Sequence, residues 1–84
     1  MADDHQLAAV QSAAEQLALL GGTRPRVIPE PGATRIEIEV TGRLADHWPQ
    51  VLDVLNQGAD FGLTLTHTGQ TAWLRIERET GTHP

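Results

Sequence analysis

The chain of 84 residues contains no cysteine, so it has neither a disulfide scaffold nor a thiolate zinc site. A chain this short forms one domain, residues 1–84, whose small core leaves a net stability of only a few kcal/mol. There is little room for a deep active site. We therefore expect the fold to depend on tight packing or on association with another molecule.

Lysine is absent as well, and every positive charge is an arginine. The 11 acidic residues outnumber the 6 arginines and give a formal net charge of −5. A field of this sign repels phosphate backbones, so nucleic acid is not an expected partner. Because the chain lacks long hydrophobic runs and a basic segment followed by a hydrophobic one, we expect neither a signal peptide nor a membrane span, and a cytoplasmic location.

Catalytic and cofactor motifs are missing too. The glycines form neither a dinucleotide-binding nor a phosphate-loop pattern, and the only serine, Ser12, has no base placed to activate it. Glu37 and Glu39 alternate along one predicted strand, but arginines are expected opposite both, which favours an ion-paired, solvated face over acid catalysis. We therefore expect a non-catalytic protein that has no cofactor.

Histidine is the residue type whose ordinary pKa lies near neutrality, and the chain has four, none with the spacing of a metal-ligand set. They are His5, His47, His67 and His83. The run Asp3-Asp4-His5 is favoured as the start of a helix over a cation site. His47 is favoured as an exposed first-turn residue behind a capping Asp46, rather than as half of an acid/base relay. No metal site is expected.

Hydrophobic periodicity predicts a first helix over residues 4–20. Its apolar positions recur at spacings of three and four, Asp3 or Asp4 caps its start, and Gly21-Gly22 supplies a left-handed stop. The stripe consists of Leu7, Val10, Ala14, Leu17 and Ala18. This stripe is expected to cover one side of a sheet.

A second amphipathic helix is predicted over residues 47–57. Proline is tolerated only in the first turn of a helix, so Pro49 limits where this one begins, and Gly58 closes it. Trp48 belongs to its apolar stripe and is expected to pack in the core.

Two strands are predicted over 24–29 and 34–41, on either side of a turn-rich segment. The register that pairs Pro29 with Thr34 matches arginines with glutamates on one face and apolar residues with one another on the other face. Its charged pairs are Arg26 with Glu37 and Arg24 with Glu39. Because proline donates no ladder hydrogen bond, the first strand is expected at a sheet edge.

A second hairpin is predicted from strands over 61–68 and 71–78. Gly69-Gln70 fits a two-residue turn with glycine at the first central position, where a positive φ costs glycine little. The pairs in this register include Thr66 with Trp73 and His67 with Ala72. His67 is therefore expected at the margin of the core, on the apolar face.

The element order αββαββ predicts an α+β domain. It is a circular permutation of the βαββαβ order of ferredoxin-like folds, so we expect a mainly antiparallel four-stranded sheet, in the order 1-2-4-3, with both helices on one face. The sheet residues expected in the core are Val27, Ile36, Ile38, Val40, Leu63, Leu65, Leu74 and Ile76. The opposite face of the sheet is expected to be open.

That open face is the candidate interaction surface. Its expected members are Trp73, Arg75, Thr64, Thr66, Thr71, Ile28 and Arg26. Trp73 has two interpretations: a half-exposed ring opposite Thr66 or stacked on Arg75, or an anchor for another protein molecule. The favoured function is a small non-catalytic interaction domain, acting as adaptor, regulatory subunit or inhibitor. We expect it to self-associate as a homodimer through the open sheet face around Trp73, or through an edge strand.

An alternative function is a small-ligand-binding or catalytic module at a subunit interface. His67 and His47 would then supply polar groups, and Arg75 would clamp an anion. This alternative rests on analogy between folds. Single-stranded RNA binding on the open sheet is disfavoured, because that face has one aromatic residue and the net charge is negative.

Overall fold

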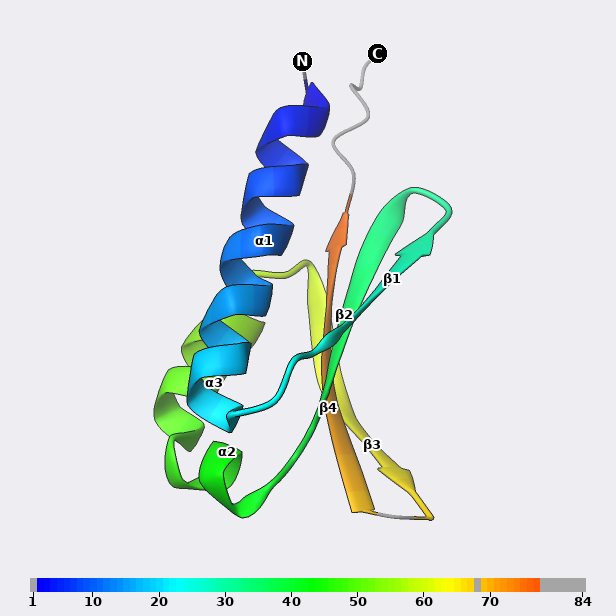
Figure 1. The fold of residues 1–84 in the computed structure, drawn as a ribbon. Helices are drawn as coiled ribbons and strands as arrows, with labels where there is room; N and C mark the ends of the chain where they lie inside the picture. The colour runs from blue at the N-terminus through cyan, green and yellow to red at the C-terminus, as the bar shows by residue number, and fades with distance from the viewer. Residues whose placement is uncertain (1, 68, 78–84) are drawn as a thin grey trace.

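The computed structural model describes residues 2–67 and 69–77, with side chains from Ala8 onward. The elements are α1 (Ala2–Gly21), β1 (Arg26–Glu30), β2 (Ala33–Glu39), α2 (Gly42–Asp46), α3 (Trp48–Leu55), β3 (Asp60–Thr66) and β4 (Gly69–Glu77). They form two layers, with the helices on one face of the sheet (Figure 1). No helix in this part of the chain is long and apolar enough to cross a membrane.

The four strands form one sheet in the order β1-β2-β4-β3, and each neighbouring pair is antiparallel. The predicted α+β class and the predicted strand order are confirmed. The proline-bearing strand β1 lies at one edge and the threonine-bearing strand β3 at the other. The two central strands, β2 and β4, lie under α1 and provide the sheet's share of the core.

The first hairpin has the predicted register. Pro29 pairs with Thr34 and Arg26 with Glu37. Between β1 and β2 lie Pro31 and Gly32, and Gly32 has a φ of +74°, as the third position of a type II turn requires. β1 begins two residues later than predicted, so the expected pairing of Arg24 with Glu39 lies outside the ladder.

The predicted register of the second hairpin is wrong by four residues. β3 ends at Thr66, β4 begins at Gly69, and Thr66 pairs with Gly69. Thr68 and Arg78, which the prediction placed in these strands, lie outside the described residues. Gly69 does have a positive φ, +144°, but it is the first residue of β4 and not a turn centre.

The observed register brings Gly62 opposite Trp73, where the prediction had Thr66. A Cβ atom on Gly62 would lie only 3.1–3.2 Å from three atoms of the indole ring. Glycine is therefore the residue that leaves space for the tryptophan here. Because the shift is an even number of residues, each side chain of the hairpin stays on its predicted face.

A short helix not expected from the sequence precedes α3. Thr41 caps α2, its hydroxyl oxygen accepting a hydrogen bond from the Leu44 amide at 3.2 Å. Pro49 is the second residue of α3, and a proline there prevents a continuous helix from running through from Gly42. Asp46 therefore ends α2 and does not cap α3; the N-cap position belongs to His47, whose side chain makes no capping hydrogen bond.

The core joins the helices to the two central strands. Its buried members are Val10, Ala13, Leu17, Ile36, Ile38, Leu44, Val51, Val54, Leu55, Ala72, Leu74 and Ile76, with Leu20, Val40 and Trp48 packed against them. α1 starts earlier than predicted, so Asp3 and Asp4 lie within it. Its buried stripe contains Ala13, while Ala14 and Ala18 are half-buried. The side chain of Leu7 lies outside the described part.

Three residues expected in the core are exposed instead. Val27 is 48% exposed, Leu63 50% and Leu65 78%. All three lie on the edge strands, on the face that also carries the helices. The helices cover mainly β2 and β4, and the far end of β3 extends away from them (Figure 1). The helical layer is therefore narrower than the sheet.

Candidate interaction surfaces

The outer face of the sheet, opposite the helices, carries all seven residues predicted for it. Alternation along the strands places them there, because their neighbours Ile36, Ala72 and Leu74 point into the core. No helix or strand of the described chain lies over this face (Figure 1). Its side chains are Arg26, Ile28, Arg35, Glu37, Glu39, Asp60, Thr64, Thr66, Thr71, Trp73, Arg75 and Glu77.

Trp73 lies near the middle of this outer face and is half-buried. The guanidinium carbon of Arg35, from the neighbouring strand, lies 4.4 Å from the centroid of the indole ring. This is a cation–π contact, and Gly62 leaves room for the ring on the other side. The residue that contacts the ring is therefore Arg35, whereas the sequence predicted Thr66 or Arg75. Arg35 holds the ring in one orientation.

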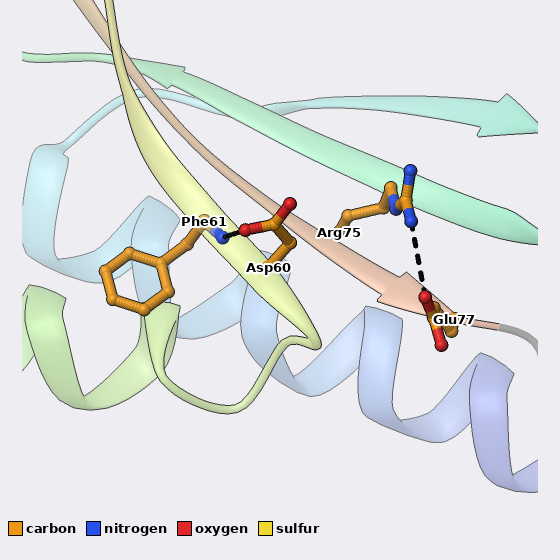
Figure 2. Close-up of polar contacts among 4 residues, drawn as sticks. All are labelled: Asp60, Phe61, Arg75 and Glu77. Carbon is orange, nitrogen blue, oxygen red and sulfur yellow. Dashed lines mark hydrogen bonds and ion pairs between the residues drawn. The ribbon is translucent and has the colours of Figure 1, made fainter.

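Two arginines face each other directly across the central strands. Arg35 on β2 pairs in register with Arg75 on β4, an unfavourable juxtaposition of like charges. Each is neutralised along its own strand. Arg35 Nε lies 2.7 Å from Glu37 Oε2, and Arg75 Nη2 lies 3.2 Å from Glu77 Oε2, as Figure 2 shows for the second pair. The middle of the outer face is therefore close to electrically neutral.

A depression of about 390 Å³ opens at one end of the outer face. It borders Trp73, because Glu37 is the cross-strand neighbour of Trp73 and Thr71 lies two residues before it. The lining contains two arginines and two glutamates beside threonines, so it is polar and balanced in charge. The lining residues are Thr23, Arg24, Arg26, Glu37, Ile38, Glu39, Thr66 and Thr71.

The three residues of the ligand-binding alternative lie in different parts of the molecule. His47 is in the helical layer between α2 and α3, whereas Arg75 projects from the outer face of the sheet. His67 follows β3 in the exposed connection to β4, so its predicted position beside Ala72 at the core margin is wrong. The structure brings no pair of these residues together in one pocket among those described.

No group of three or more histidine, aspartate or glutamate side chains that could hold a metal ion occurs in the described part of the chain. His83 and the side chain of His5 lie outside it.

A second surface lies along β3, one of the two edge strands, and the exposure of its apolar side chains was not expected from the sequence. Phe61, Leu63 and Leu65 point to the helical side of the sheet, and they are 39%, 50% and 78% exposed. Asp60 Oδ1 accepts a hydrogen bond of 3.1 Å from the Phe61 amide (Figure 2). We call the strand Asp60–Thr66 with these three apolar side chains the β3 edge. The signal in the sequence was the absence of proline and of all but one charge from this strand.

Neither a family model, nor a curated protein, nor a solved structure matches the chain. We therefore infer its function from these surfaces alone.

Proposed function

We propose that the protein is a small non-catalytic interaction domain that acts by binding another protein molecule on the outer face of its sheet. The observation that supports this proposal is the position of Trp73, which lies on a sheet face that no described element covers. Tryptophan and arginine dominate the energetics of protein interfaces, and here Arg35 packs on the ring.

The geometry of the face suits a protein partner. Arg35 and Gly62 fix the indole ring before binding, so little side-chain entropy remains to be lost on association. The depression beside the ring offers hydrogen-bonding groups of both signs. Such a surface fits an adaptor, a regulatory subunit or an inhibitor. The partner is a second copy of the chain or a different protein.

The test compares three versions of the full chain as immobilised bait: wild type, Trp73→Glu and Leu19→Glu. Leu19 is 76% exposed on α1, on the helical side, so its variant adds the same charge away from the outer face. Circular dichroism first shows that both variants are folded. A purified candidate partner should bind the wild type and Leu19→Glu, and should bind Trp73→Glu at least about tenfold more weakly.

Light scattering of the same three proteins distinguishes self-association from binding a different partner. A lower molecular mass for Trp73→Glu than for the other two proteins would show that copies meet on the outer face. Equal binding of every partner by all three baits, with equal masses, would refute the proposed role of this face.

A further inference from the structure

We infer that a second copy of this chain pairs with the first along the β3 edge, so that two four-stranded sheets become one continuous sheet. The inference rests on the proposed function, because both require the chain to act by binding protein. It uses a different surface, however, and leaves the outer face available.

The backbone of β3 presents hydrogen-bonding groups to the outside at Phe61, Leu63 and Leu65. Thr66 and Gly69 flank a two-residue connection, and such a pair exchanges both of its ladder hydrogen bonds. Because the pattern alternates, the groups of Phe61, Leu63 and Leu65 point away from β4. The hydrogen bond from the Phe61 amide to the Asp60 carboxylate shows independently that this amide points outward.

The strand is complementary to itself. If a two-fold axis passes through Leu63, antiparallel pairing puts Leu63 opposite its own copy and Phe61 opposite Leu65 of the second copy. Side chains opposite each other share a face, so the exposed apolar residues of the two copies meet on the helical side. These are the positions whose backbone groups point outward. The same register therefore satisfies the backbone and the side chains.

The charge within β3 itself does not oppose this pairing, although each copy carries a net charge of −5. Asp60 is the one charged residue of β3, and the register places it opposite Thr66 of the second copy. The two Asp60 residues are then six strand positions apart, or about 20 Å. This distance exceeds the Debye length of about 8 Å at physiological ionic strength, so their repulsion is screened.

The other edge of the sheet does not offer such a site. β1 contains Pro29, which donates no hydrogen bond, and the charged residues Arg26 and Glu30. It does have one exposed apolar residue on the helical side, Val27, which is 48% exposed against 50% for Leu63. Val27 is therefore a matched control for Leu63.

The test measures the mass of the full chain by light scattering and analytical ultracentrifugation over a range of concentrations. The wild type should dimerise, and Val27→Arg should change the dissociation constant less than about threefold. Leu63→Arg should raise it by about tenfold or more, because it opposes two like charges and removes apolar contact. Leu63→Pro should also be monomeric but folded, since it removes only an outward-pointing amide.

The register itself is tested by mixing two variants. Leu63→Arg and Leu63→Glu should each be monomeric alone, but a 1:1 mixture should contain more dimer, because the axis brings opposite charges together. A mixture that stays monomeric would overturn pairing centred on Leu63. A monomeric wild type would overturn the inference altogether, while binding of a partner that depends on Trp73 would still support the proposed function. Dimers that persist in Leu63→Arg and dissociate in Trp73→Glu would place self-association on the outer face instead.

Discussion

The two edge strands of the sheet differ in their content of proline and charged residues, and therefore in how readily a further strand could add to them. β1 carries a proline and two charged residues among five, whereas β3 carries no proline and a single charge among seven. Proline and charge are the means by which proteins prevent strands from adding to an edge. Of the two edges, only β1 therefore carries both features that oppose the addition of a strand, and the β3 edge is where a second copy would pair.

The largest expected effect is the difference in stability lost when the same side chain is shortened in the centre of the sheet and at the β3 edge. Leu74 on β4 is fully buried, so Leu74→Ala should lower the free energy of unfolding by about 2–5 kcal/mol. Leu65→Ala removes the same atoms from a side chain that is 78% exposed and should cost the monomer less than about 1 kcal/mol. Urea denaturation at low protein concentration measures both. Equal losses would mean that β3 is packed like the central strands.

The next effect concerns how β3 is attached to the sheet. A Cβ atom on Gly58 would lie 2.8 Å from the Arg75 carbonyl oxygen, which also accepts a hydrogen bond of 2.8 Å from the Ala59 amide. Gly58→Ala should therefore cost about 1–3 kcal/mol and speed hydrogen exchange in β3 more than in β1. Gly42→Ala is the control, because nothing lies within 4 Å of its added Cβ. Unchanged exchange in β3 would show that the strand is not held at this point.

A smaller effect is expected at the turn that holds the opposite edge. Gly32 has a φ of +74°, so Gly32→Ala should cost about 1 kcal/mol, while Gly32→Asn should cost less, since asparagine tolerates this conformation. Backbone hydrogen exchange should become faster in β1 and stay unchanged in β3. Equal stabilities of the two variants in urea would contradict the assignment of a strained turn residue.

The smallest effects should come from the ion pairs on the outer face. The Arg35–Glu37 pair has side chains 27% and 22% exposed, against 40% and 59% for Arg75–Glu77. Solvent screens the second pair more, so Glu77→Gln should cost a few tenths of a kcal/mol or less, and Glu37→Gln up to about 1 kcal/mol. Thermal unfolding at low and high salt compares them. A larger loss for Glu77→Gln would reverse the ranking.

The register of the first hairpin could be predicted from the sequence, because it matches Arg26 with Glu37 and apolar residues with one another, and proline and glycine at residues 31 and 32 supply the turn. The sequence was insufficient for the second hairpin. Gly69 needs a positive φ in both registers, so the choice between them depended on the packing of Gly62 against Trp73, a contact that exists only in the folded sheet. The short helix α2 was missed because it has only five residues and depends on the Thr41 cap.

The outer face was predictable from alternation, but its main contact was not. Arg35 reaches Trp73 from a strand that no turn connects to β4, so the sequence contains no local signal for their register. The exposure of Leu63 could not be predicted for a different reason. Whether an apolar residue on an inner face is buried depends on how far the helices extend across the sheet, and that is decided by tertiary packing.

The two tryptophans lie in different layers of the molecule. Trp48 packs against the core from α3, and Trp73 lies on the outer face with a guanidinium group against its ring. The chain therefore contains two intrinsic fluorophores that sense separate environments. With Trp48→Phe, the emission spectrum would come from the outer face, and with Trp73→Phe from the helical layer. Events on the two sides of the sheet can thus be followed optically without attaching a label.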